Sequence, residues 1–199
     1  VEQMPPRETM MVYGGSDYAV TASGGDYTVH IVLGVDSQSR MWVLDLWRAQ
    51  ASSDKWVEAF CDLVIKWKPI GWAEETGQIK SGVGPFLLKE QALRGAYVVR
   101  EAFPTRGDKA VRAQSIRGRM AMHGLYVQAG APFLEALLSE MMSFPVAVHD
   151  DQVDALGLCG QLMDRMSAGV DKKAPPEKPV LRTLDEVYAT PLMAPKRRR

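Results

Sequence analysis

Short apolar runs early in the chain predict strands. One run covers residues 9–16 and ends at Asp17. Two more, at 27–35 and 41–47, flank the polar turn 36–39 and together predict a hairpin. Because Asp17 directly follows the first run, we expect it at the carboxyl end of a strand, where ligands bind in α/β sheets.

Further along, helical spacing of apolar residues alternates with short strand patterns. The spacing predicts helices over 53–68, 85–93, 108–122, 133–143 and 150–166. Strands are predicted over 70–75 and 97–101, with a strand or turn over 125–128. The chain therefore has the pattern of an α/β fold with a central sheet flanked by helices.

Composition narrows the class of protein. A length of 199 residues with 46% hydrophobic content suits one domain with a sizeable core. No apolar run approaches the ~20 residues of a membrane span and residues 1–9 lack a signal-peptide layout, so we expect no membrane partner and an intracellular location. Cys61 and Cys159 lack metal-ligand spacing and are expected to be packed thiols. The isolated His30 favours a structural role over metal ligation.

Charge is zero overall but unevenly distributed. Residues 170–199 hold eight Lys and Arg against four Asp and Glu, and the rest of the chain holds sixteen against twenty. We expect a folded domain over 1–168 and a flexible basic tail over 169–199, which either serves solvation or docks onto DNA or a partner. The glycine-rich stretch 77–85 lacks the P-loop pattern, which argues against a nucleotide site there.

Carboxylates gather at three separated places. These are Asp17, the pair Glu74 and Glu75 after a strand, and the group Asp150, Asp151 and Asp154 at the start of the last helix. Loop charge, an N-cap and the helix dipole explain some of them individually. If the three places meet, however, the acids would repel one another unless a divalent cation neutralised them. Oxygen-only ligands suit Mg²⁺ or Mn²⁺, and two such ions can hydrolyse a phosphodiester.

An ordered series of motifs resembles the nuclease domain of tailed-phage terminase large subunits. It comprises Asp17-Tyr18-Ala19, Gly25-Asp26-Tyr27, Trp72 to Gly77, Gly107 to Gln114, Phe144-Pro145 and His149 to Leu156. The resemblance covers about residues 9–166. It implies a ribonuclease H-like fold related to RuvC resolvases, with a central mixed sheet flanked by helices. It also implies a metal-dependent DNA endonuclease, located in the host cytoplasm, that cuts concatemeric genomes during packaging.

The resemblance also implies roles for individual residues. Asp17, Glu74 and Asp151 are the expected catalytic residues, and the expected ligands of two Mg²⁺ or Mn²⁺ ions are Asp17, Glu74, Glu75, Asp150, Asp151 and Asp154. Glu74 is preferred over Glu75 because the family places a glutamate a few residues before a glycine, although a one-residue strand shift would exchange their faces. Lys109 and Arg112 match a basic helix that binds DNA phosphates, and Asp26 matches a structural turn.

One departure from the family concerns the packaging motor. Full terminases carry an N-terminal ATPase with a Walker motif that is absent from this sequence, so we expect an excised domain that can cut DNA but cannot translocate it. Double-stranded DNA, the ATPase domain, the small terminase subunit and the portal are the partners that the resemblance implies. The alternatives are a non-catalytic module that docks onto DNA or the motor, and a phosphotransferase related to sugar kinases and actin.

Overall fold

A computed structural model describes most of the residues before Ala168. The described residues are 3–19, 27–76, 84–104, 111, 113–146 and 149–167. Asp26, Lys109, Arg112 and the predicted tail 169–199 lie outside them, so the expectations for these residues stay predictions.

A mixed six-stranded sheet forms the centre of the fold, in the order β5-β4-β1-β2-β3-β6. The strands are β1 (Met11–Asp17), β2 (Thr28–Val35), β3 (Met41–Ala49), β4 (Gly71–Glu75), β5 (Arg100–Phe103) and β6 (Leu125–Val127). β1, β2 and β3 pair antiparallel, as the predicted hairpin requires. β4 is parallel to β1 and to β5, and β6 is parallel to β3.

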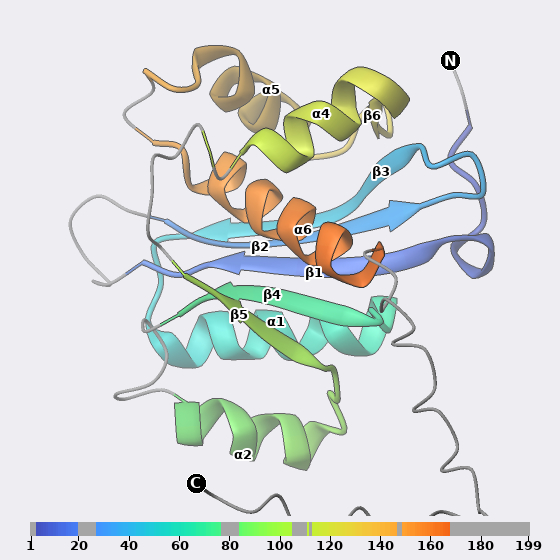
Figure 1. The fold of residues 1–199 in the computed structure, drawn as a ribbon. Coiled ribbons are helices and arrows are strands. Elements are labelled where there is room, and N and C mark those ends of the chain that lie inside the picture. Colours follow the sequence, from blue (N-terminus) through green and yellow to red (C-terminus); the bar gives the residue numbers. More distant parts are fainter. Residues whose placement is uncertain are drawn as a thin grey trace, which may run out of the picture. The chain divides into compact units, whose positions relative to one another are not determined.

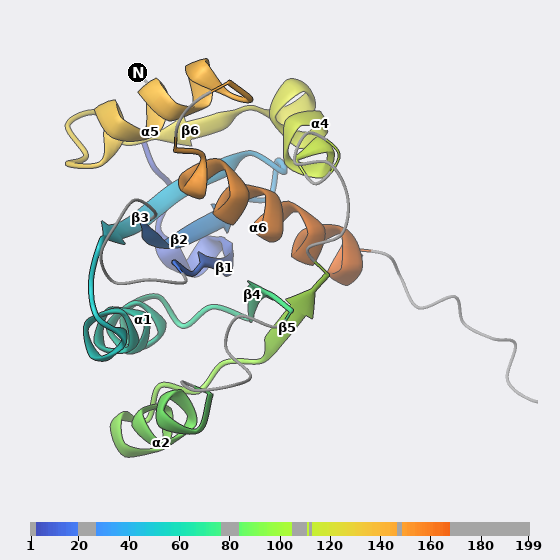
Figure 2. The same cartoon turned by 90° about the vertical axis from the view of Figure 1, so that its left-hand side faces the viewer.

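Helices cover both faces of this sheet (Figures 1 and 2). They are the α-helices α1 (Ser53–Trp67), α2 (Gly84–Arg94), α4 (Gln114–His123), α5 (Leu134–Ser143) and α6 (Asp151–Ser167). A short 3₁₀ turn, η1 (Arg7–Thr9), precedes β1. α6 crosses one face, with α4 and α5 on the same side, and α1 and α2 lie on the other side. The expected α/β architecture with a mixed sheet is therefore confirmed.

The fold has two apolar cores, one on each face of the sheet, and alternate residues of the central strands belong to different cores. Ile31 and Leu33 of β2 belong to the core beneath α6. Val32, between them, packs in the opposite core with Phe60 of α1 and Trp72 of β4. All of β2 is buried, as expected for a strand covered on both faces. Alternate residues of a central strand therefore pack against opposite layers of helices.

The strand predicted over 97–101 is displaced in the structure. β5 covers Arg100–Phe103, whereas Tyr97 and Val99 lie in the preceding connection and are 73% and 64% exposed. The prediction followed the apolar residues that end at Val99, whereas the segment that pairs with β4 begins with the charged residues Arg100 and Glu101. The first strand likewise begins at Met11 rather than residue 9. Of the helix predicted over 108–122, the structure describes a helical Val111 and α4, which begins at Gln114.

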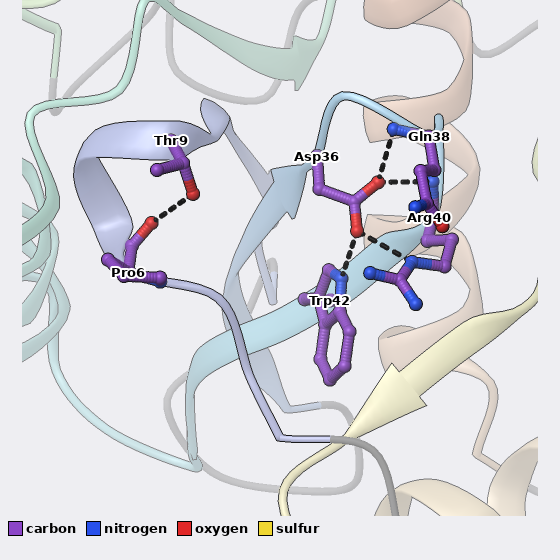
Figure 3. A network of polar contacts seen from close by, with 6 residues as sticks. All are labelled: Pro6, Thr9, Asp36, Gln38, Arg40 and Trp42. Carbon is purple, nitrogen blue, oxygen red and sulfur yellow. Dashed lines mark hydrogen bonds and ion pairs between the residues drawn. The ribbon is translucent and has the colours of Figure 1, made fainter.

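The turn between β2 and β3 is held by one carboxylate (Figure 3). Asp36 accepts hydrogen bonds from the backbone N–H groups of Gln38 and Arg40 at 2.9 and 3.0 Å. It also accepts from Arg40 Nε at 2.7 Å and from Trp42 Nε1 at 3.1 Å. Burial acts to raise the pKa of Asp36, but these hydrogen bonds hold the pKa below its usual value. The carboxylate fixes the hairpin register at the end of β2 remote from Asp17.

His30 and the two cysteines have the structural roles that the sequence predicts. His30 is fully buried, its Nδ1 lies 2.7 Å from Ser16 Oγ, and its Nε2 lies 2.9 Å from the carbonyl oxygen of Trp56. Trp72 Nε1 donates to the same Ser16 hydroxyl at 2.8 Å. Cys61 and Cys159 are buried free thiols, and burial raises the pKa of both.

Candidate metal centre

Asp17 is the last residue of β1, and its side of the sheet follows from Gly15. A Cβ atom on Gly15 would lie 2.6 Å from Cys159 Sγ and 2.8 Å from the carbonyl oxygen of Ala155, so this position faces α6 at closest approach. Asp17 is two residues further on and therefore shares that face. Its antiparallel partner Val29 also packs in the core beneath α6.

α6 runs antiparallel to β1 and carries Asp151 towards Asp17. Ala155 lies against Gly15, and Asp151 is one helical turn earlier on the same side of the helix. Four helical residues advance about 6 Å, and two strand residues advance about 6.6 Å. Asp151 is therefore nearly level with Asp17. Its Oδ2 accepts a hydrogen bond from the Tyr27 N–H at 3.3 Å, which ties the helix start to the start of β2.

Glu75, rather than Glu74, lies on the face that carries Asp17 and Asp151. Ser16 pairs with Glu74 in the parallel register between β1 and β4, so Asp17 and Glu75 lie one position further at the same level. Ala73 packs beneath α6, and Glu75 has the same parity as Ala73. Its β5 neighbour Phe103 belongs to the same core. The structure thus brings Asp17, Glu75 and Asp151 to one edge and one face of the sheet.

Glu74 faces the opposite layer and has a partner there. Its carboxylate receives a bidentate pair of hydrogen bonds from Arg100, at 3.0 Å from Nε and 2.8 Å from Nη2. Both side chains are largely buried, with 11% and 16% exposed. Burial raises the pKa of Glu74, and the adjacent guanidinium opposes part of that rise. The preference for Glu74 as a metal ligand stays a prediction, but its face and its ion pair favour Glu75.

The start of α6 separates the remaining acids. The carbonyl oxygen of Asp150 accepts from the Asp154 N–H at 2.8 Å, so Asp150 occupies the N-cap position. A carboxylate from α5 also caps the helix: Glu140 Oε1 accepts from the Gln152 N–H at 2.6 Å and the Val153 N–H at 3.2 Å. Because Glu140 satisfies these donors, the acids of the first turn are not required to cap it.

The chemistry of the donor set fits a hard divalent cation. Asp17, Glu75 and Asp151 supply only carboxylate oxygens, which are the ligands of Mg²⁺ and Mn²⁺. The positive end of the α6 dipole points at the same edge and moderates the repulsion among the acids. Across the described ranges, no group of three His, Cys, Asp or Glu side chains is already positioned to hold a metal ion. The fit therefore rests on donor type, shared face and shared edge.

Three residues around these acids were not found from the sequence. Arg100 lies within the misplaced strand, and Glu140 follows helical spacing on α5 without any motif. Tyr27 was assigned to a strand pattern and to the Gly25-Asp26-Tyr27 motif without a role at the site, yet its N–H donates to Asp151. Only Glu140 could have been recognised from the sequence, because it is a charged residue on the otherwise apolar side of its helix, between Leu137 and Met141.

Comparisons with known proteins agree on the architecture. The profile of a family described as "Terminase RNaseH-like domain" matches residues 14–159. The human cytomegalovirus terminase nuclease domain, in a Mn-soaked, inhibitor-bound structure, has a TM-score of 0.57 and 15% identity, over 79% of this chain and 83% of that one. The large terminase of a thermophilic bacteriophage, in complex with ADP, has a TM-score of 0.53 and 12% identity, over 78% of this chain and 40% of that one.

A third similar structure is RuvC of Thermus thermophilus with a Holliday junction substrate, with a TM-score of 0.47 and 14% identity, over 79% of this chain and 97% of that one. A search of curated protein sequences finds no match. Among the helices that the structure describes, none combines the length and apolar character needed to span a bilayer.

Proposed function

Because the chain belongs to the terminase RNaseH-like domain family, we propose that it is a divalent-metal-dependent endodeoxyribonuclease that cuts concatemeric DNA during genome packaging. Membership of this family supports a nuclease role, and the ribonuclease H-like fold implied by the sequence is confirmed. The observation that carries the proposal is the placement of Asp17, Glu75 and Asp151 on one face at one edge of the sheet.

In this proposal the three carboxylates hold the cations and the surrounding structure holds the carboxylates. Asp17 at the end of β1, Glu75 at the end of β4 and Asp151 at the start of α6 would hold the cations. Two bound Mg²⁺ or Mn²⁺ ions would supply an activated water and charge stabilisation for the leaving oxygen. Tyr27 orients Asp151 through its N–H, while Asp154 and Asp150 support the site from the first turn and the N-cap.

The proposed substrate is double-stranded DNA, and the proposed setting is the packaging motor. The large terminase of the thermophilic bacteriophage was solved with ADP, and the match covers 40% of that chain. We infer that the ATPase function, the small subunit and the portal act with this domain rather than within it. Lys109 and Arg112 remain proposed phosphate contacts.

The test is cleavage of supercoiled plasmid DNA with Mn²⁺, with Mg²⁺, or with EDTA. We expect nicking and linearisation with either metal, none with EDTA, and loss of both in Asp17→Asn, Glu75→Gln and Asp151→Asn. Glu58→Gln is the matched control, because Glu58 is an exposed acid on α1, paired with Lys55 on the opposite face. That variant should cut at the wild-type rate.

Two results would contradict the proposal. Cleavage that survives EDTA would remove the metal from the mechanism, and undiminished cleavage by Asp151→Asn would remove Asp151 from the site. If no metal supports cutting but DNA binding persists and weakens on deletion of residues 170–199, the chain is instead a docking module.

A further inference from the structure

A pocket opens beside the proposed metal centre on the same face of the sheet. Its volume is about 340 Å³, and it is lined by Arg48, Ala136, Ser139, Glu140, Ser143, His149 and Gln152. Arg48 comes from β3, His149 and Gln152 flank the start of α6, and the rest come from α5. The pocket is therefore bounded by the same helix start that carries Asp151.

Tyr27 connects the pocket to the acids. Its N–H donates to Asp151, and its ring lies under the Arg48 guanidinium, with 3.5 Å from Cζ to the ring centroid. The His149 ring packs edge-on against the same tyrosine at 5.4 Å. A cation stacked at this distance is held by the electron-rich ring face. Tyr27 therefore fixes the guanidinium in position.

The strand register gives the distance between Arg48 and the acids. Asp17 pairs with Val29, and Val29 pairs with Arg48, so the three positions form one row on the α6 face. Two strand spacings separate the Cα atoms of Asp17 and Arg48 by about 10 Å. The rise along the helix axis of DNA is about 3.4 Å per nucleotide, so this distance corresponds to a few nucleotides.

The pocket leaves the charge of Arg48 available to a ligand. Within the ranges that the structure describes, Arg48 forms no ion pair, and its buried Nε donates no hydrogen bond. Glu140 lines the same pocket, but its oxygens accept from the Gln152 and Val153 N–H groups and the Gln152 side chain. The pocket thus contains the positively charged Arg48, while the carboxylate of Glu140 is hydrogen-bonded to the start of α6.

We propose that Arg48 binds a backbone phosphate of the DNA, within a few nucleotides of the scissile phosphate. This inference rests on the proposed nuclease function. A guanidinium has a planar fork of donors that matches phosphate oxygens, and stacking on Tyr27 preorganises it. The contact positions the strand over the carboxylates without reading sequence.

The test is DNA binding in EDTA, measured by fluorescence anisotropy with a labelled duplex over about 50–200 mM salt. We expect Arg48→Gln to bind about tenfold more weakly and to reduce the slope of log K against log salt by about 0.9, which is one phosphate contact. Arg48→Lys keeps the charge and should retain the slope while losing part of the affinity. Melting curves confirm that each variant is folded.

Arg94→Gln is the matched control, because Arg94 pairs with Asp62 on the opposite side of the sheet. It should leave the affinity and the slope unchanged. Wild-type affinity and slope in folded Arg48→Gln would overturn the inference. A loss confined to some sequences, with an unchanged slope, would also overturn it and would indicate a base contact. Binding in EDTA requires no metal, so failure here is distinct from failure of metal-dependent cleavage.

Discussion

Neutralising the two neighbouring glutamates of β4 should have different effects: Glu74→Gln should lower stability, and Glu75→Gln should lower DNA cleavage. Glu74→Gln removes the charge that pairs with Arg100, which is largely buried and would be left without a counter-charge. Breaking a buried pair from one side costs about 3–5 kcal/mol. The glutamine keeps one acceptor for Arg100, and burial already raises the pKa of Glu74, so the lower end, about 3 kcal/mol, is expected.

A loss of about 3 kcal/mol should lower the melting temperature by about 6–12 °C for a domain of this size. Glu75→Gln should leave the melting temperature within a few degrees of the wild-type value. For DNA cleavage the order should be reversed, with Glu75→Gln losing more activity than Glu74→Gln. Removing a group that only orients a metal ligand costs about 10–100-fold, so loss of a direct ligand at Glu75 should cost at least about 100-fold.

The assay pairs thermal unfolding in EDTA with plasmid cleavage in Mn²⁺, well below the melting temperature of either variant. The double variant Glu74→Leu/Arg100→Leu should recover most of the lost stability, because an apolar pair replaces both charges. The reasoning is refuted if Glu74→Gln loses cleavage without losing stability while Glu75→Gln cuts normally. That outcome would return the ligand role to Glu74.

Three further predictions test the surroundings of the site. Burial lowers the pKa of His30 to about 4 in the folded protein. Between pH 6.5 and pH 4 the unfolded chain therefore binds a proton that the folded protein does not, and this favours unfolding. About 3 kcal/mol should be lost as the pH falls from 6.5 to 4, and His30→Gln should remove this part of the pH dependence in urea titrations. Asp151→Asn keeps an acceptor for Tyr27 but removes repulsion, so it should raise the melting temperature in EDTA; a clear fall would mark Asp151 as a structural acid. Gly15→Ala would press a methyl group against Cys159 and the α6 backbone, and should lower both stability and cleavage, whereas Gly118→Ala, which places its methyl group in open space on α4, should lower neither.

Local patterns were sufficient to predict most of the elements and the location of the acids. Apolar runs placed β1 to β4 within one or two residues, because a buried strand needs consecutive apolar side chains. They failed at β5, where the apolar run ends at Val99 and the paired residues begin at Arg100. The ends of β1 and β4 and the start of α6 carried the acids in the sequence itself.

Which acids face one another was decided only by packing. Alternation guarantees that Glu74 and Glu75 point to opposite faces, but the sequence does not state which face receives α6. Gly15 has no side chain, so the α6 backbone packs closely against that face of β1. On the other face, Arg100 forms an ion pair with Glu74. Arg48 likewise lies in one row with Asp17 only through the register of three strands. The position of each charge along the chain can be read from the amino-acid sequence alone. Which charges share a face depends on strand register and helix docking, because these are long-range contacts.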